Sequence, residues 1–233
     1  MRRAFPAVAR PPLALLFRCA TRTEVAFLSS LPAGGCIVAA NHISHFDPVI
    51  ISLAFPLYID WIAMEALFRG PVTSRLFDWL RAIPVARDGS DRSSLRVACA
   101  RLEAGRVVGI FPEAGIRAGA GSVLEGAPMW PGVAALSVLA EKPVVPCVIV
   151  GSDRLYRPRA WTERPPVWLA FGAPVWPPHG GVERRTARNR VRDGLAKAFP
   201  DLKEHLRRTY RLRPGDLPAT PQARKGEDRQ ASA

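Results

Sequence analysis

Short runs of consecutive apolar residues recur along this chain, and segments with helical spacing lie between them. The apolar runs occupy residues 36–40, 58–63, 83–85, 107–111, 143–150 and 167–171. Runs without polar alternation are typical of strands that are buried on both faces of a sheet. The intervening segments predict helices over residues 47–55, 73–81, 93–103, 132–140 and 182–211. Strands that alternate with helices indicate an α/β fold, in which a mostly parallel sheet is covered by helices.

The chain of 233 residues suits a single α/β domain with a segment of different character at each end. Residues 1–24 form a basic N-terminal segment, and residues 25–211 hold the alternating strands and helices. Residues 212–233 are polar, contain proline and glycine, and show no periodicity. This composition predicts a disordered C-terminal tail.

The N-terminal segment predicts an amphipathic helix. A helix that begins at Pro12 places Leu13, Leu16 and Phe17 on one face, with arginines on a neighbouring face. The apolar run is too short for a signal peptide, and the longest stretch without charged residues, 25–46, contains proline and glycine and does not suit a membrane span. Two interpretations stay open: the helix lies on a membrane surface, or it packs on the core with its arginines in water.

The formal net charge is +13, from 33 Lys and Arg against 20 Asp and Glu. Residues 1–30 carry five arginines and one acidic residue, and residues 181–200 carry six basic and two acidic residues, so the surplus lies partly at the two ends. Such a charge suits a nucleic acid, an anionic membrane or an anionic small substrate. It can also reflect only the base composition of the coding DNA. The interleaved aromatic and basic residues expected of a nucleic-acid-binding protein are missing from the sequence.

The four cysteines, Cys19, Cys36, Cys99 and Cys147, form no C-x-x-C pair, and their spacing matches no zinc pattern. Three of them lie in apolar stretches, as ordinary buried thiols do. We therefore expect a reduced, cytosolic compartment and not a secreted protein.

The candidate chemistry begins in the segment Asn41-His42-Ile43-Ser44-His45-Phe46-Asp47-Pro48, between a predicted strand and a predicted helix. Ligands bind at this edge of open α/β sheets. His42 and Asp47 lie five residues apart across a tight turn, and a histidine whose ring is held by a carboxylate is a better general base. The alternative is structural, and in either case Asp47 is expected to be the N-cap of the helix.

Charged residues also follow two other predicted strands. Glu113 and Arg117 come after the strand over residues 107–111, and Arg87 follows the strand over residues 83–85. A guanidinium group binds phosphate through two parallel hydrogen bonds. Any one arginine of this basic chain can be a solvated surface charge, but three charged residues at strand ends favour a ligand site.

Four blocks of the sequence, in the same order, resemble those of the glycerolipid (lysophospholipid) acyltransferases. NHISHFDP resembles their N-H-x-x-x-x-D block, and IPVARDGSD resembles a second block that ends in an arginine. FPEAGIR resembles their F-P-E-G-T-R block, and VVPCVIVGSD a fourth block centred on V-P-V. The resemblance spans residues 36 to about 171 and implies a glycerolipid acyltransferase-like domain.

The resemblance also implies a reaction. An acyl group passes from a thioester, on coenzyme A or acyl carrier protein, to a hydroxyl group of a lysophospholipid or glycerol phosphate, with no further cofactor and no metal. His42 would take the hydroxyl proton, and Asp47 would orient His42 and stabilise its charge. Arg87 and Arg117 would bind the acceptor phosphate. The residues expected to bind the substrates are Asn41, Arg87, Glu113, Gly115 and Arg117.

Two departures from the family pattern concern the acceptor. The family's Gly-Thr is Ala114-Gly115 here, so a threonine hydroxyl is missing, and Ile116 intervenes before Arg117. The lysine of the family's Lys-x-Gly is absent at Trp130-Pro131-Gly132. The acceptor can therefore differ from plain lysophosphatidic acid. A lipid-binding or remodelling protein with a weakened site stays an alternative to the enzyme.

Lipid acceptors imply contact with a bilayer. We therefore expect a peripheral protein on the cytoplasmic face of a membrane, without a transmembrane helix. Its partners would be the membrane surface with its lysolipid and the acyl thioester, and not a nucleic acid. The basic ends of the chain would attract anionic lipids.

Overall fold

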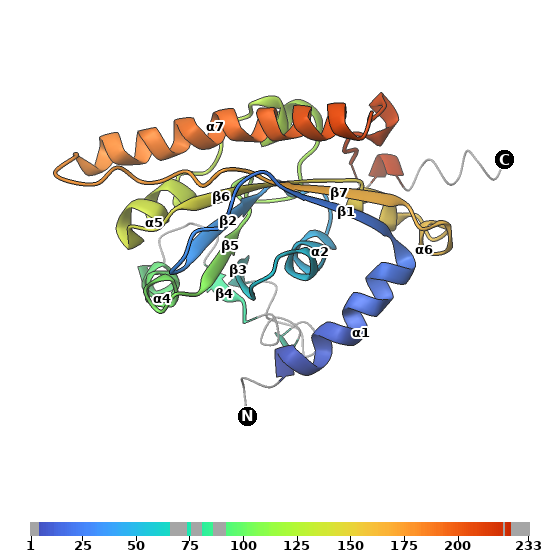
Figure 1. The fold of residues 1–233 in the computed structure, drawn as a ribbon, viewed down its shortest axis with the longest axis horizontal. Helices are drawn as coiled ribbons and strands as arrows, with labels where there is room; N and C mark the ends of the chain where they lie inside the picture. Colours follow the sequence, from blue (N-terminus) through green and yellow to red (C-terminus); the bar gives the residue numbers. More distant parts are fainter. Residues whose placement is uncertain (1–4, 66–73, 76–80, 86–91, 221, 225–233) are drawn as a thin grey trace.

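The fold was analysed in a computed structural model that describes residues 5–65, 74–75, 81–85, 92–220 and 222–224 (Figure 1). The strands are β1 (Arg22–Phe27), β2 (Cys36–Ala40), β3 (Ile59–Met64), β4 (Ile83–Val85), β5 (Val107–Ile110), β6 (Val144–Val150) and β7 (Pro166–Phe171). The α-helices are α1 (Phe5–Ala20), α2 (Asp47–Ala54), α4 (Arg92–Glu103), α5 (Gly132–Ala140), α6 (Ala160–Glu163) and α7 (Arg184–Thr209). The 3₁₀ turns are η2 (Gly119–Gly121), η3 (Val123–Glu125), η4 (Ser152–Tyr156) and η5 (Pro214–Asp216). The helix expected over residues 73–81 lies largely outside the described residues.

The strands of the described chain form one sheet in the order β1-β7-β6-β2-β5-β3-β4. Neighbouring strands are parallel except for β6 and β7, which are antiparallel. The α/β fold with a mostly parallel sheet is therefore confirmed. The carboxyl ends of β2, β5 and β6 meet at one edge, because these three strands run in the same direction.

Helices cover both faces of the sheet, and each face has its own apolar core (Figure 1). Alternate strand residues point to opposite faces, so Ile37 and Ala39 join one core while Val38 and Ala40 join the other. The first core is completed by α4, α5 and α7, and the second by α1, α2 and α6. This two-sided burial explains why the strands are apolar at every position.

Gly109, in the middle of β5, shows how closely the second face is packed. A methyl group on its Cα would lie 2.6 Å from side-chain atoms of both Ile59 and Trp61. Only glycine leaves room for these two side chains to pack over the backbone of β5. The ring of Trp61 also stacks on Phe111, with the ring centroids 4.5 Å apart. The packing of the sheet thus places Phe111 at the edge where β5 ends.

The two ends of the chain differ from the expectations. Arg22–Phe27 is an edge strand, β1, which the sequence pattern did not predict because its residues are mostly exposed. Helix α1 begins before Pro12 and contains it. Its Phe17 is buried against α2 and α6, whereas Leu16 is half exposed.

The beginning of the expected disordered tail also packs on the domain. Residues 212–220 and 222–224 follow α7, and the side chain of Arg224 is buried. It pairs there with the buried carboxylate of Asp153 in η4, so this part of the tail differs from a solvated segment. A contact between residues so far apart in the chain leaves no periodic signal.

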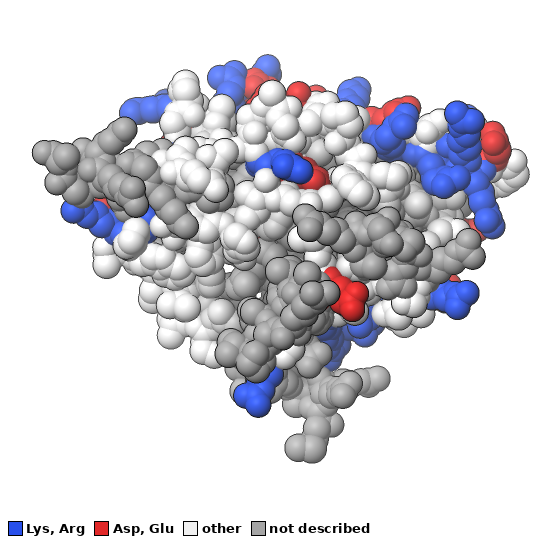
Figure 2. Space-filling view, turned by 180° about the vertical axis from the view of Figure 1, so that it is seen from behind, with Lys and Arg blue, Asp and Glu red and all other residues white. Residues whose placement is uncertain are grey.

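Helix α7 carries much of the basic surface. Its buried side is a stripe of apolar residues at helical spacing, Ala187, Val191, Leu195, Phe199, Leu202 and Leu206. The exposed side carries most of its arginines. Figure 2 shows Lys and Arg gathered along the upper rim of the molecule, where α7 lies. The basic surplus of residues 181–200 therefore lies mainly on the solvated face of α7.

Candidate active site

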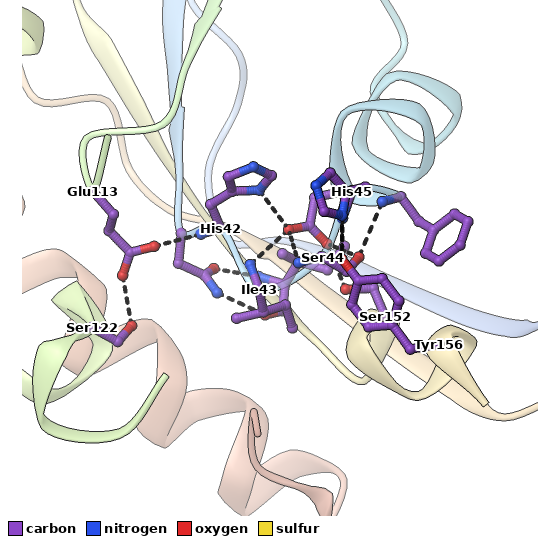
Figure 3. A network of polar contacts seen from close by, with 12 residues as sticks. His42, Ile43, Ser44, His45, Glu113, Ser122, Ser152 and Tyr156 are labelled. Atoms are coloured by element: carbon purple, nitrogen blue, oxygen red, sulfur yellow. Dashed lines mark hydrogen bonds and ion pairs between the residues drawn. The ribbon is translucent and has the colours of Figure 1, made fainter. Parts of the chain in front are cut away.

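His42 and Asp47 meet at the edge where β2 ends and α2 begins (Figure 3). The ring nitrogen Nδ1 of His42 lies 2.9 Å from Oδ2 of Asp47. A carboxylate only accepts hydrogen bonds, so Nδ1 carries the proton and the lone pair of the ring is on Nε2. Among the described residues, no group forms a hydrogen bond with Nε2. The side chain is 16% exposed, so the lone pair is left for a ligand.

The carboxylate of Asp47 is fully buried and accepts five hydrogen bonds. Oδ2 accepts from His42 and from the backbone N–H groups of Ile43 and Ser44, at 2.7 and 2.8 Å for the latter two. Oδ1 accepts from the hydroxyl groups of Ser44 and Ser152. A buried carboxylate with this many donors is fixed in place, and it fixes the ring of His42 in turn.

Asp47 is not the N-cap of α2, contrary to the expectation. The N-cap is Phe46, without a side-chain cap, and Asp47 is the first residue of the helix. Its side chain turns back to the preceding turn, because the donors of that turn already converge on it. The aspartate therefore organises the turn of residues 41–47 instead of the helix end.

Phe111 and the loop after β5 confine His42 from the other side. The rings of His42 and Phe111 stack with centroids 4.1 Å apart, and Phe111 rests in turn on Trp61. The backbone N–H of Arg117 donates to the carbonyl oxygen of His42 at 2.8 Å. Together with Asp47, these contacts restrict the rotation of the imidazole.

Glu113 is buried and holds His42 through the main chain (Figure 3). Its Oε2 accepts from the backbone N–H of His42 at 2.6 Å. Its Oε1 accepts from the hydroxyl of Ser122 at 2.7 Å and from the N–H of Val123 at 2.8 Å. Burial raises the pKa of this carboxyl group, and the three hydrogen bonds oppose that rise. Both oxygens accept hydrogen bonds from the protein, which suits a scaffold role, and the expected contact with the acceptor stays a prediction.

The other expected substrate-binding residues occupy different positions. Asn41 is fully buried, and its amide exchanges two hydrogen bonds with the backbone of Ile149, at 3.0 and 2.8 Å, which ties β2 to β6. Arg117 is exposed beside His42, as a phosphate-binding residue requires. A methyl group on Gly115 would meet no atom within 4 Å. Arg87 lies outside the described residues.

The turn η4, which follows β6, supplies two contacts that the sequence reasoning missed. Ser152 donates to Asp47, and the hydroxyl of Tyr156 forms hydrogen bonds with the backbone N–H and the ring of His45 (Figure 3). Ser152 lies two residues after the buried strand β6, just as Glu113 lies two residues after the predicted strand over residues 107–111, so its position in the sequence could have indicated it. Gly151 makes the turn possible, because its φ is +96° and a Cβ atom would lie 2.4 Å from the carbonyl oxygen of Pro166.

The arrangement is suited to removing a proton from a bound hydroxyl group and not to thiol chemistry. Burial raises the pKa of Cys36 to about 12, and that of Cys147 well above its ordinary value. Neither cysteine is therefore a ready thiolate. Within the described ranges, no three His, Cys, Asp or Glu side chains converge in a way that could hold a metal ion.

Comparison with known proteins places this geometry in context. The family model described as Acyltransferase matches residues 22–150. An uncharacterized protein of Mycobacterium leprae (strain TN) is 31% identical over 192 residues, which are 73% of this chain and 47% of that protein. A 1-acyl-sn-glycerol-3-phosphate acyltransferase of Bacillus subtilis (strain 168) is 27% identical over 124 residues, which are 52% of this chain and 59% of that enzyme. The chain thus spans about half the length of these relatives.

A solved structure has the same fold. The crystal structure of the 1-acyl-sn-glycerophosphate (LPA) acyltransferase PlsC from Thermotoga maritima matches with a TM-score of 0.60. The match covers 87% of this chain and 83% of that one, at 23% sequence identity. His42, Asp47, Glu113 and Ser152 all lie within or next to the region that the family model matches.

Proposed function

The chain belongs to the acyltransferase family, and we propose that it moves a fatty acyl group from an acyl thioester to a hydroxyl group of a lysophospholipid or glycerol phosphate. The observation that carries the proposal is the His42–Asp47 pair, with the lone pair on Nε2 open at the strand edge. Either acyl-coenzyme A or acyl carrier protein can supply the thioester. No further cofactor is required.

In the proposed reaction, Nε2 of His42 takes the proton of the acceptor hydroxyl as its oxygen attacks the thioester carbonyl carbon. The carbon–sulfur bond then breaks, and the thiolate leaves with the proton that His42 releases, so the products are an ester and a free thiol. Asp47 stabilises the imidazolium that forms in between. The transfer needs no acyl-enzyme. The hydroxyl groups of Ser44 and Ser152 both donate to Asp47, so neither is arranged as a nucleophile that His42 activates.

We propose that the acceptor carries a phosphate that binds Arg117. Arg117 is exposed, and its backbone N–H is fixed to the carbonyl oxygen of His42. A guanidinium group there can hold phosphate through two charge-assisted hydrogen bonds. The name of the Bacillus subtilis relative supports 1-acylglycerol-3-phosphate as the first acceptor to test.

We further propose that the protein acts at a membrane surface. No helix of the described ranges has the length and apolar composition needed to cross a bilayer. On α1, however, Leu15 and Leu16 are 65% and 50% exposed beside the exposed Arg18. Apolar side chains next to a cation suit the boundary between head groups and acyl chains of an anionic bilayer.

A panel of lysolipids tests the function. Purified protein is incubated with acyl-coenzyme A or acyl carrier protein thioesters and each lysolipid in vesicles, and the products are identified by mass spectrometry. The proposal predicts a new ester with at least one phosphate-bearing acceptor and an equal amount of free thiol. If lysolipids bind but no ester forms with either thioester, the alternative of a lipid-binding protein with a weakened site is favoured.

A further inference from the structure

The C-terminal segment after α7 docks on η4, and we call its residues 213–220 and 222–224 the C-terminal latch. Several polar contacts join the latch to η4. Asp153 of η4 accepts from the N–H of Ala219 at 3.0 Å and from Nε of Arg224 at 2.6 Å. The neighbouring Arg154 pairs with Asp216 of the latch at 2.5 Å.

The pair of Asp153 and Arg224 is buried, unlike most ion pairs of this protein. Asp153 is 0% exposed and Arg224 is 5% exposed. Arg224 also donates to the carbonyl oxygen of Leu217 at 2.9 Å, so one guanidinium group ties the latch to itself and to η4. A buried carboxylate that loses its cation is left uncompensated, which is among the more costly changes in a folded protein.

The turn η4 also contacts residues 41–47, which we call the catalytic turn because they carry the proposed base His42. Ser152, directly before Asp153, donates to Asp47, and Tyr156 at the end of η4 contacts His45. Figure 3 shows Ser152 and Tyr156 beside the turn that carries His42. The turn η4 therefore lies between the latch and the His42–Asp47 dyad. Its adjacent residues Ser152 and Asp153 carry the hydroxyl that holds Asp47 and the carboxylate of the buried ion pair.

We propose that Arg224 is a positioning residue for the His42–Asp47 dyad, because its pairing with Asp153 holds η4, and with it Ser152, against Asp47. The inference rests on the proposed acyl transfer for its kinetic consequence, but not for its structural one. Burial raises the pKa of Asp153, and the charge of Arg224 is the largest influence that opposes this rise. Without Arg224, the carboxyl group either takes up a proton or moves toward water, and both responses remove the charged contact that holds the latch.

Kinetic measurements on Arg224→Met test this role. We expect kcat to fall on the order of 10- to 100-fold with the KM values of both substrates changed less than about threefold, because a displaced base slows the chemical step without removing a substrate contact. The matched control is Arg208→Met, which removes an exposed arginine paired with Glu204 and should leave kcat within about twofold of wild type. Wild-type kcat in Arg224→Met would overturn the proposal.

A double-mutant cycle tests the route of the effect. If Arg224 acts through Ser152, then Ser152→Ala already removes the last link, and adding Arg224→Met should lower kcat by less than about threefold more. Multiplicative losses in the double variant would show that Arg224 acts by another route and would contradict the proposal. Should Arg224→Met fail to fold, Arg224→Lys takes its place. We expect it to lower kcat at least about threefold, because an ammonium group lacks the planar fork that joins Asp153 and Leu217, and unchanged kcat would contradict the proposal.

Hydrogen exchange measured by mass spectrometry separates this inference from the proposed function. Arg224→Met should speed amide exchange in residues 151–157 and in the catalytic turn, whereas Arg208→Met should not. If the wild type transfers no acyl group to any lysolipid, the proposed function fails while this comparison still decides whether the latch holds the turn. Unchanged exchange in both segments would overturn the inference even if the enzyme is active.

Discussion

Glu113 satisfies three donors with two oxygens, so replacing it with an isosteric amide has a predictable cost. In Glu113→Gln, an NH2 group must face one of the N–H or O–H donors of His42, Ser122 and Val123. We expect the free energy of unfolding to fall by about 1–3 kcal/mol, the cost of a buried unsatisfied polar group. Urea unfolding measures it. The control Glu125→Gln changes an exposed residue paired with Lys203, and equal losses in the two variants would contradict the scaffold role.

Arg117 is the residue that we propose binds the acceptor phosphate, because it is exposed and its backbone is bonded to His42. Arg117→Ala should raise the KM for the acceptor roughly 10- to 100-fold, since a charge-assisted hydrogen bond contributes about 1.5–3 kcal/mol. The KM for the acyl donor should change little. Steady-state kinetics with each substrate varied in turn provide the measurement. Parallel changes in both constants would give Arg117 a structural role or a contact with the donor.

At the scale of elements, Gly151 sets the path from β6 into η4. Gly151→Ala should lower the free energy of unfolding by more than about 2 kcal/mol, because it adds a clash with Pro166 to the strain of a positive φ. Gly126→Ala is the matched control, since Gly126 has a φ of +81° but no atom within 4 Å of a Cβ. It should cost about 1 kcal/mol. Thermal or urea unfolding compares the two variants. Equal losses in the free energy of unfolding would contradict the prediction, because the loop after β6 would then have moved to relieve the clash.

The elements that the sequence predicted well are those whose apolar pattern is local. The predicted bounds of β2, β4 and α5 agree with the structure. β1 escaped prediction because an exposed edge strand has no apolar pattern, and its partner β7 lies far away in the chain. The packing of Arg224 depends on a similarly distant residue, Asp153.

In the candidate site too, the sequence predicted the local contact and missed the contacts between distant residues. The spacing of His42 and Asp47 within one turn predicted their contact, which the structure contains. The sequence could not match the Ser152 hydroxyl to Asp47, because the two residues are 105 positions apart. Glu113 is likewise 71 positions from His42, whose backbone N–H it accepts from. Such pairs form only when the parallel strands bring their carboxyl ends together.

At the scale of the whole molecule, the exposed leucines of α1 predict how the protein meets a bilayer. Leu15→Gln/Leu16→Gln should weaken binding to anionic vesicles about tenfold or more, because each leucine would lose apolar burial in the lipid. The control Val97→Gln/Leu139→Gln alters exposed apolar residues on α4 and α5, away from α1 (Figure 1). Co-sedimentation at two salt concentrations measures binding, which salt should weaken. Equal losses in both double variants would place the membrane contact elsewhere.

The rate of acyl transfer by His42→Ala tests whether His42 is the general base. Product ester is quantified by mass spectrometry for wild type and variant with the best acceptor of the lysolipid panel, and thermal unfolding verifies that the variant is folded. The account predicts a loss of about 10²–10⁴-fold in kcat, the contribution of a general base, because Nε2 of His42 is the group left to take the hydroxyl proton. A folded variant that keeps more than about a tenth of the wild-type rate would contradict it, since the base would then be another group.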